Sequence, residues 1–186
     1  MGKLWGYSMR DVLGFAIFVI ASLAGFAVAR VTGAPAATPT AAEIHYAPDE
    51  NLEQFDVRLI DEARASIDMA AYVLTDRGVI EALERAGRRG VIVRVWRDPG
   101  MVQKVGDADV AAFIAPDEPG VTLREKAPGP LMHLKGYCLD GALLRTGSAN
   151  FSHSGLTAQD NDLVVIPSAQ ACAGFEAKFG KVWEGK

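Results

Sequence analysis

The chain has 186 residues, of which 49% are hydrophobic, and its formal net charge is −4 at pH 7. This hydrophobic content is enough to bury a core, which argues against an intrinsically disordered chain. The acidic balance argues against a protein that holds nucleic acid through a uniformly basic surface.

The N-terminal residues contain an uninterrupted apolar segment. Val12–Ala29 carries no charged side chain and approaches the roughly 20 residues that a membrane-spanning helix needs. Lys3 and Arg10 precede it, which fits both a secretory signal peptide and an anchor. The small-x-small sequence Ala27-Val28-Ala29 favours cleavage, whereas the length of the segment and Arg30 favour a retained helix. A core helix is a third reading, which the missing polar face disfavours.

Basic residues before this segment predict that the rest of the chain lies outside the cytoplasm, as a periplasmic domain that is either released or membrane-anchored. Residues 1–30 are therefore interpreted as a signal peptide or transmembrane anchor. Residues 31–42 are rich in Ala, Pro and Thr and predict a flexible linker. Residues 43–186 are interpreted as a single folded domain.

Helix and strand patterns alternate through the folded part. Apolar spacing predicts a helix over residues 50–65, a core strand over 66–74, a second helix between Asp76 and Gly90, and a strand over 91–96. A strand, a helix and a strand at this spacing predict a right-handed parallel unit. Further along, we expect a short helix over residues 108–115, strands over 121–124 and 163–166, and a final helix after Ser168. Together these elements predict an α/β domain.

The segment between residues 131 and 146 predicts a hairpin. Alternate side chains of a strand share a face, so a strand over Leu131–Leu139 would place His133 and Lys135 side by side. Asp140-Gly141 then predicts a tight turn, because such turns need positive φ. Residues 142–146 would form the return strand.

The return strand leads into Gly147-Ser148-Ala149-Asn150, which would bring Ser148 and Asn150 back beside His133 and Lys135. An imidazole can attack phosphorus or protonate a leaving oxygen near neutral pH. The lysine would supply charge, and the hydroxyl and amide would supply directional donors to phosphate oxygens. This set of groups favours phosphodiester chemistry.

Taken one at a time, these residue types are more often structural than catalytic. Taken together they meet every position and gap of the pattern H-x-K, four residues, D, six residues, G-S-x-N. On this motif the chain resembles the phospholipase D superfamily over about residues 43–185, and it is most similar to the small bacterial single-motif endonucleases. The resemblance implies an α/β fold with a phospholipase D-like mixed sheet flanked by helices, preceded by the N-terminal apolar helix.

The resemblance also implies roles for the motif residues. His133 would be the nucleophile or the general acid, and a phosphohistidine intermediate would form. Lys135, Ser148 and Asn150 would bind the phosphate, and no metal or cofactor would be needed. Asp140 completes the catalytic motif, at a position that is more structural than chemical.

A single motif copy implies a symmetric homodimer with one site across the two-fold axis. The imidazole also needs a partner to fix its tautomer. The family's glutamate position is occupied here by Asn161, which departs from the pattern. Asn161 and its neighbours Asp160 and Asp162 are therefore the candidates for orienting His133.

The residues leave the substrate open between nucleic acid and phospholipid. Residues 1–30 carry three basic side chains and one acidic one, so their removal lowers the net charge from −4 to −6. An endonuclease is the hypothesis that the resemblance favours, and a phospholipase D is favoured by the possible anchor and the acidic surface. A non-catalytic, membrane-tethered binding module is the third hypothesis, and the intact motif argues against it.

Cys138 and Cys172 are the only cysteines. Both lie in expected core elements, which favours buried free thiols, although a disulfide is possible outside the cytoplasm. Two cysteines and scattered histidines do not form a zinc-binding pattern.

Overall fold

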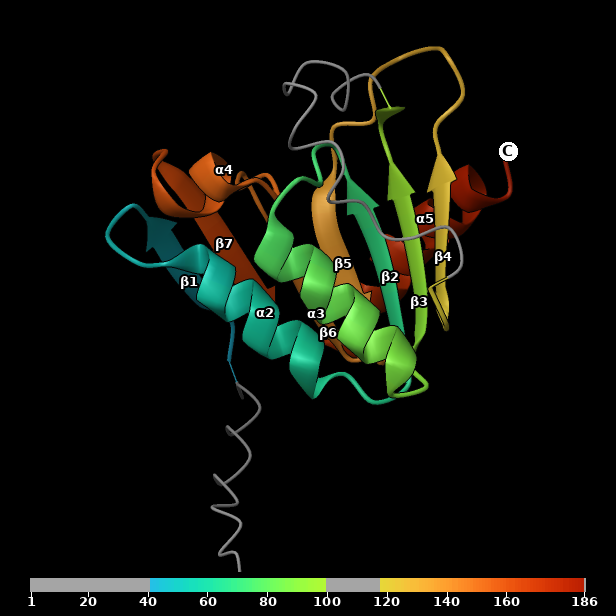
Figure 1. Cartoon of the computed structure of the whole chain (residues 1–186), viewed down its shortest axis with the longest axis horizontal. Helices are drawn as coiled ribbons and strands as arrows, with labels where there is room; N and C mark the ends of the chain where they lie inside the picture. The colour runs from blue at the N-terminus through green and yellow to red at the C-terminus, as the bar shows by residue number, and fades with distance from the viewer. Residues whose placement is uncertain (1–40, 100–117, 186) are drawn as a thin grey trace, which may run out of the picture. The chain divides into compact units, whose positions relative to one another are not determined.

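The protein is represented by a computed structural model that describes residues 41–99 and 118–185 (Figure 1). These residues belong to one compact unit that extends from Thr38 to Lys186. The expected signal or anchor segment, most of the linker and the expected helix over residues 108–115 lie outside the described residues. No helix in the described ranges has the length and apolar character needed to cross a membrane.

Strands and helices alternate along the described chain. In order they are β1 (Glu43–Ala47), α2 (Leu52–Glu62), β2 (Ser66–Ala71), α3 (Arg77–Arg88), β3 (Ile92–Arg97), β4 (Val121–Glu125), β5 (Lys135–Leu139), β6 (Leu143–Gly147), α4 (His153–Thr157), β7 (Asn161–Ile166) and α5 (Ala169–Trp183). The short helix α4 was not expected from the sequence. Apart from β1, the remaining elements correspond to the predicted ones, with shifted ends.

The strands form one mixed sheet in the order β1-β7-β6-β5-β2-β3-β4. β2, β3 and β4 run parallel to one another, whereas β5, β6, β7 and β1 are joined by antiparallel pairs. The predicted parallel unit is confirmed as β2–α3–β3. Helices α2 and α3 cover one face of the sheet and α5 covers the other, so the predicted mixed sheet flanked by helices is also confirmed (Figure 1).

The two outer strands of the sheet differ in their surroundings. β1 pairs with β7 alone among the described strands, and its side chains Ile44 and Tyr46 are 54% and 55% exposed. β4 pairs with β3 on the opposite edge. Bulky apolar groups therefore lie on an edge strand that immediately follows the linker.

The hairpin between β5 and β6 forms as the sequence predicts. Asp140 and Gly141 have φ values of 53° and 65°, and the Ala142 N–H donates to the Leu139 carbonyl at 2.9 Å. Positive φ at both central residues is the mark of the type I′ turn, whose twist matches the flanking strands.

β5 begins later than predicted, at Lys135 instead of Leu131. The residues before it bond to neighbouring loops: the Met132 N–H donates to the Asp98 carboxylate at 3.1 Å, and the Leu134 carbonyl accepts from the Tyr72 N–H at 2.8 Å. His133 therefore lies in a loop that leads directly into the strand, where its side chain is exposed.

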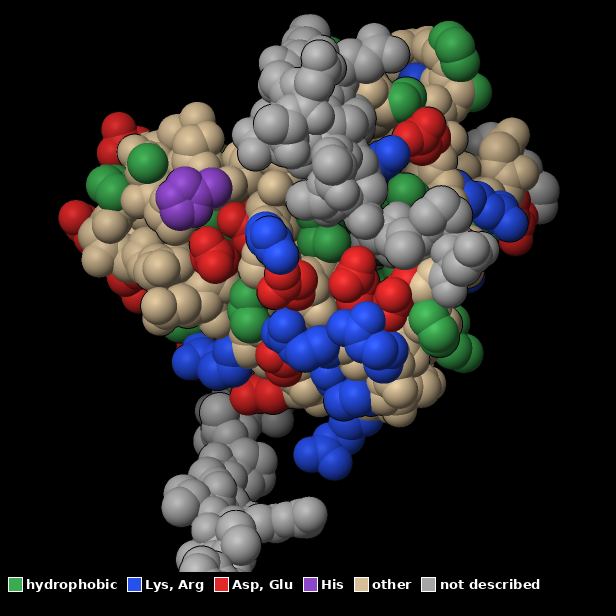
Figure 2. Space-filling view, in the orientation of Figure 1, with side chains coloured by type: hydrophobic (Ala, Val, Ile, Leu, Met, Phe, Trp, Pro, Cys, Tyr) green, Lys and Arg blue, Asp and Glu red, His purple; other side chains and the backbone are tan. Residues whose placement is uncertain are grey.

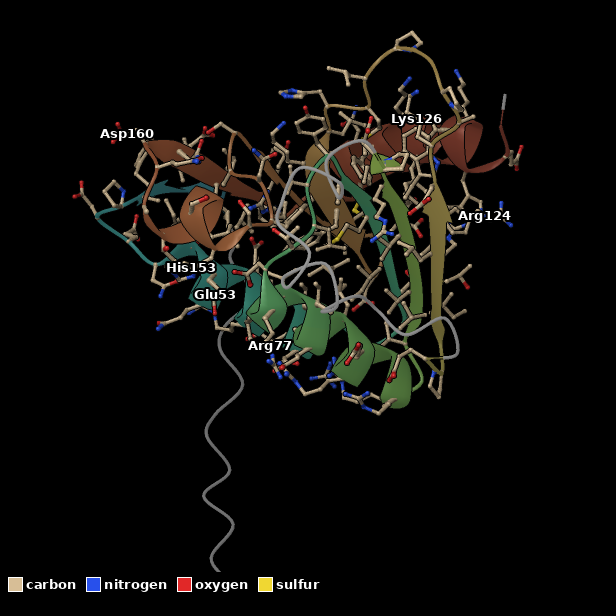
Figure 3. The ribbon with its side chains drawn as sticks, turned by 45° about the horizontal axis from the view of Figure 1, so that its top comes forward. Glu53, Arg77, Arg124, Lys126, His153 and Asp160 are labelled. Atoms are coloured by element: carbon tan, nitrogen blue, oxygen red, sulfur yellow. A yellow bond between two sulfur atoms is a disulfide. The ribbon has the colours of Figure 1, made fainter. Side chains whose placement is uncertain are left out.

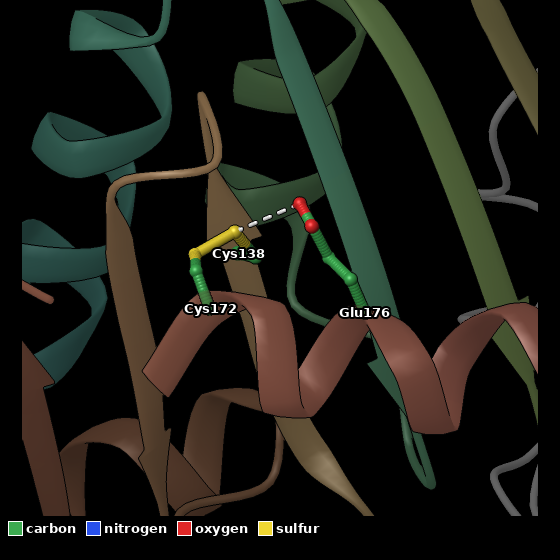
Figure 4. Close-up of side chains that lie close together, drawn as sticks. All are labelled: Cys138, Cys172 and Glu176. Atoms are coloured by element: carbon green, nitrogen blue, oxygen red, sulfur yellow. Dashed lines mark hydrogen bonds between the residues drawn. A yellow bond between two sulfur atoms is a disulfide. The ribbon is translucent and has the colours of Figure 1, made fainter. Parts of the chain in front are cut away.

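The prediction that both cysteines are free thiols is wrong. Cys138 in β5 and Cys172 in α5 form a disulfide, with their Cα atoms 5.5 Å apart, and Glu176 Oε1 lies 3.3 Å from the Cys138 sulfur (Figure 4). Their sequence separation of 34 residues gave no local sign of this proximity. It arises because α5 packs against the sheet over β5. The bond fixes α5 to the strand that carries Lys135.

Candidate active site

His133 and Lys135 come together at the start of β5, as predicted. The Lys135 Nζ lies 3.1 Å from His133 Nδ1 and 3.3 Å from Nε2, and it donates to the His133 carbonyl at 2.9 Å. The ammonium thus lies against the imidazole, the group that can attack phosphorus through a ring nitrogen.

Tyr72 completes this cluster, and the sequence reasoning did not identify it. Its ring centroid lies 4.4 Å from that of His133, and the Lys135 Nζ lies 4.9 Å from the Tyr72 ring centroid. The ring thus packs against the imidazole while its face attracts the ammonium. An aromatic residue at the carboxyl end of a buried strand was the available signal, because ligands often bind at such ends in α/β sheets.

Burial affects the charge of Lys135. Its side chain lies almost entirely inside the protein, at 8% exposure. Desolvation lowers the pKa of the Lys135 ammonium, because a charged group loses hydration when it is buried. A bound phosphate would restore a counter-charge to this ammonium, which suits a residue that binds an anion.

Asp140 lies at the other end of β5, away from His133, and its place corrects its assignment to the catalytic set. Its carboxylate accepts the backbone N–H groups of Arg64, Ala65 and Ser66 at distances between 2.7 and 3.3 Å. These groups follow the end of α2, where the chain turns into β2. The motif aspartate is therefore a structural residue that ties the hairpin turn to the α2–β2 loop.

Ser148 bonds to Asp162 on β7, and the expected convergence of Ser148 and Asn150 with His133 and Lys135 on one phosphate stays a prediction. Ser148 Oγ accepts the Asp162 N–H at 2.9 Å, and the Ser148 N–H donates to the Asp162 carboxylate at 3.2 Å. This reciprocal pair turns the serine towards β7. Within the described ranges no hydrogen bond joins Ser148 or Asn150 to His133 or Lys135.

Asn150 lines a pocket of about 830 Å³. Its Oδ1 atom is buried without a hydrogen-bond partner in the described structure. The other lining residues come from α2, from the loop before α3 and the start of α3, and from α4 and the residues beside it. They include Glu53, Arg77 and His153, which gather on the same side of the molecule (Figure 3). The loop that follows β2 connects this pocket to the histidine, since Tyr72 N–H bonds to Leu134 and Leu74 bridges to Phe151.

Two groups of side chains among the described residues have metal-binding chemistry. Cys138, Cys172 and Glu176 form the first, but their sulfurs are bonded to each other and are not thiolates. The second is formed by Glu53, Asp76 and His153, whose ligand atoms lie within 4.8 Å of one another at the rim of the Asn150 pocket. The Asp76 carboxylate already accepts the Val79 N–H and caps α3.

None of the three expected orienting residues contacts His133. Asn161 Nδ2 donates to the Gly155 carbonyl at 2.9 Å, and Asp162 is held by Ser148. Asp160 is exposed just before the start of β7 (Figure 3). Within the described chain, the groups that contact the His133 ring are Lys135 and Tyr72.

Comparison with known families decides the relationship. A family model described as "Cardiolipin synthase, PLD-like domain" matches residues 57–183, which is more than half of the chain. The chain belongs to the phospholipase D-like family. The matched range contains the whole motif from His133 to Asn150, so the resemblance that the sequence indicated is confirmed.

Curated relatives in this family carry lipid-related names. A mitochondrial cardiolipin hydrolase from Drosophila melanogaster is 30% identical over 147 residues, which cover 68% of this chain and 56% of that protein. A phospholipase D from Rickettsia bellii is 30% identical over 125 residues, which cover 67% of this chain and 60% of that protein. The chain thus spans a little over half the length of these relatives.

A solved structure confirms the phospholipase D-like fold. Nuc, a phospholipase D family member from Salmonella typhimurium, is 28% identical with a TM-score of 0.70, and the match covers 77% of this chain and 94% of that one. NucT from Helicobacter pylori, at 19% identity and a TM-score of 0.67, shows the same fold.

Proposed function

We propose that this chain is a phosphodiester hydrolase that works through a covalent phosphohistidine at His133 and acts on nucleic acid as an endonuclease. The observation that carries the proposal is an exposed imidazole held next to a buried lysine inside a complete phospholipase D motif. The buried lysine offers a positive charge where the phosphate would lie, and the imidazole offers the nucleophile.

The reaction divides into two displacements at phosphorus. A nitrogen of His133 attacks the phosphorus atom, a P–N bond forms, and the P–O bond to the leaving group breaks. Lys135 neutralises charge that develops on the non-bridging oxygens. Water then attacks the phosphohistidine and gives its proton to the group that had protonated the leaving oxygen, the P–N bond breaks, and the imidazole is regenerated.

The leaving oxygen needs a proton from an acid on the side opposite the nucleophile. Each chain supplies one motif histidine, so we propose that His133 of the partner subunit in a symmetric homodimer fills this role. An isologous interface places identical patches together, which would give two imidazoles to one phosphate. This proposal rests on the single motif copy and on the exposure of His133.

A nucleic-acid substrate is supported by similarity to single-motif endonucleases and by the match to nearly the whole of Nuc. The largest basic cluster visible in Figure 2 lies over the end of α3, where Arg85 and Arg89 pair with Asp61 and Arg88 pairs with Glu118. These pairs neutralise most of its charge. A nucleic-acid strand would therefore bind mainly through the site itself, with modest affinity and a weak salt dependence, because few phosphates are neutralised.

A phospholipid head group is the second candidate, and a specific observation favours it. Leu131 and Leu134, which flank His133, are 69% and 37% exposed. Apolar side chains at the rim of a site suit the boundary of a membrane, where acyl chains continue beyond the phosphate. The names of the curated relatives point the same way.

We further propose that the domain acts outside the cytoplasm, after secretion or on a membrane anchor formed by residues 1–30. The Cys138–Cys172 bond supports this location, because disulfides persist in oxidising compartments. The apolar segment Val12–Ala29 supports it independently.

The test uses the purified full chain in detergent with plasmid DNA, single-stranded RNA, and vesicles of phosphatidylcholine or cardiolipin, all with a chelator. We expect plasmid cleavage to persist and a covalent adduct on His133 to accumulate after an acid-free quench. His133→Ala should abolish both, whereas the control His45→Gln should retain them with an unchanged circular dichroism spectrum. Hydrolysis of vesicles alone would favour the second candidate, and binding without turnover would refute an enzyme.

A further inference from the structure

A fully buried ion pair lies beneath the motif. Asp56 in α2 and Arg145 in β6 both have 0% exposure. Arg145 Nε donates to Asp56 Oδ1 at 2.9 Å and Nη2 donates to Oδ2 at 2.8 Å, while the Tyr137 hydroxyl donates to Oδ1 at 2.8 Å. Burial raises the pKa of the Asp56 carboxyl, and the hydrogen bonds from Arg145 oppose that shift.

Burying two charges in a core does not by itself stabilise a fold. The desolvation cost often equals or exceeds the attraction, and well-packed apolar replacements are frequently as stable. The retained pair therefore calls for a role beyond stability, and the contacts of its remaining nitrogen indicate one.

That nitrogen joins the two halves of the motif. Arg145 Nη1 donates to the Lys135 carbonyl at 3.1 Å and to the Ala149 carbonyl at 3.3 Å. Lys135 is the motif lysine, and Ala149 lies between Ser148 and Asn150. One guanidinium group thus contacts the backbone of both segments that the motif contributes.

The sheet itself provides no such link at this point. The pairing between β5 and β6 runs from Leu139↔Leu143 to Tyr137↔Arg145 and stops there. Beyond it β6 continues against β7, where Gly147 pairs with Leu163. Among the described residues, the Arg145 guanidinium links β5 and the segment after β6 at the point where the backbone hydrogen bonds between β5 and β6 have ended.

The Phe151 ring also fixes the plane of the Arg145 guanidinium. Its central carbon lies 4.5 Å from the Phe151 ring centroid, and Phe151 directly follows Asn150. The Phe151 carbonyl in turn accepts the N–H groups of Thr75 and Asp76, which line the Asn150 pocket. The aromatic face and the carboxylate together leave the group a single orientation.

We propose that Arg145 is a positioning residue that sets the spacing between Lys135 and Asn150, with Asp56 as the anchor that orients it. This inference rests on the proposed function, because one of its tests measures turnover. A displacement of about 1 Å in a catalytic group can reduce a rate by roughly 100-fold. Loss of the bridge should therefore lower the rate of the chemical step while the substrate still binds.

The first test replaces the buried polar triad by apolar groups of similar size. The variant Asp56→Leu/Tyr137→Phe/Arg145→Met removes both charges and the hydroxyl together, so none of these three side chains leaves a buried polar partner behind, and the Lys135 and Ala149 carbonyls lose the donor that joins them. We expect a melting temperature close to that of the wild type, a kcat lower by about 10–100-fold and a KM changed by less than about 2-fold. A folded variant with wild-type kcat would overturn the proposal.

A matched control uses another ion pair of the same sheet. Asp68 in β2 and Arg94 in β3 are bonded to each other on the face that α5 covers, away from the motif carbonyls. Asp68→Leu/Arg94→Met makes the same change in charge and should leave kcat unchanged. If the triple variant does not fold, Arg145→Lys provides the test, because an ammonium keeps the charge but cannot reach all four acceptors.

Amide hydrogen exchange provides a readout that needs no activity. Peptides over residues 133–136 and 148–151 should lose protection together in the triple variant and in Arg145→Lys, and keep it in the control. Unchanged protection in both segments would overturn the inference. An inert wild-type protein would refute the proposed function instead, so the two failures are distinguishable.

Discussion

Replacing Asp140 by alanine would separate a structural role of the motif aspartate from a chemical one. The substitution removes the acceptor of the Arg64, Ala65 and Ser66 N–H groups. The position is exposed, so water replaces part of the lost hydrogen bonding. We therefore assign the three hydrogen bonds together about 1.5 kcal/mol, the lower end of the range for a charged acceptor. Alanine must also adopt a φ of 53°, which costs about 1–2 kcal/mol.

The total loss of stability is therefore about 3 kcal/mol, which corresponds to a fall in melting temperature of roughly 6–12 °C for a domain of this size. Asp140→Gly accepts the positive φ without strain and should recover about 1 kcal/mol of the loss. Thermal unfolding measures both values. Below the transition, turnover per folded molecule should stay within about 2-fold of the wild type for both variants. An alanine variant with the wild-type melting temperature and a 100-fold lower kcat would give the carboxylate a chemical role and refute this reasoning.

Three further predictions concern the site and its supports. Burial lowers the pKa of Lys135, so its charge is lost at a lower pH than that of an ordinary lysine. On the alkaline side of the pH profile, kcat/KM should therefore fall as the pH passes that pKa. An unchanged alkaline limb in Lys135→Arg would contradict this. The unfolded chain holds that proton more tightly, so this lysine destabilises the fold below its folded pKa and the penalty disappears as pH rises. Reducing the Cys138–Cys172 bond, which spans 34 residues, should cost about 3–4 kcal/mol and lower the melting temperature, whereas Cys138→Ala/Cys172→Ala should not respond to reductant. Ser148→Ala should lower the free energy of unfolding by about 1 kcal/mol through the lost bond to Asp162, and it should change KM by less than about 2-fold. A larger rise in KM would show that Ser148 contacts the phosphate, as the sequence predicts.

The sequence predicted those features that depend on neighbouring residues. Asp140-Gly141 predicted the turn, because few other pairs tolerate positive φ twice in succession. The two-residue spacing of His133 and Lys135 predicted that their side chains would meet. The strand, helix and strand pattern before them predicted the parallel unit, since its signals lie within each element.

Features that depend on packing between distant segments were not predictable in this way. The orientation of Ser148 is decided by Asp162 on a separate strand, and the disulfide is decided by how α5 crosses β5. The buried ion pair did leave a trace in the sequence. Asp56 lies four residues after Leu52 in the apolar stripe of its helix, and Arg145 alternates with the buried Leu143 in its strand. Opposite charges at two inward-facing positions are a pattern that indicates a buried pair from the amino-acid order alone.

The exposed outer strand β1 has a consequence for handling the protein. No other described strand pairs with its outer backbone edge, and this edge, with Ile44 and Tyr46 beside it, is a template to which a strand of another molecule can add. In concentrated solution, one molecule would pair with the next along this edge strand, which is remote from His133. Aggregates that form there would leave the motif intact, so a turbid preparation can still be a competent one.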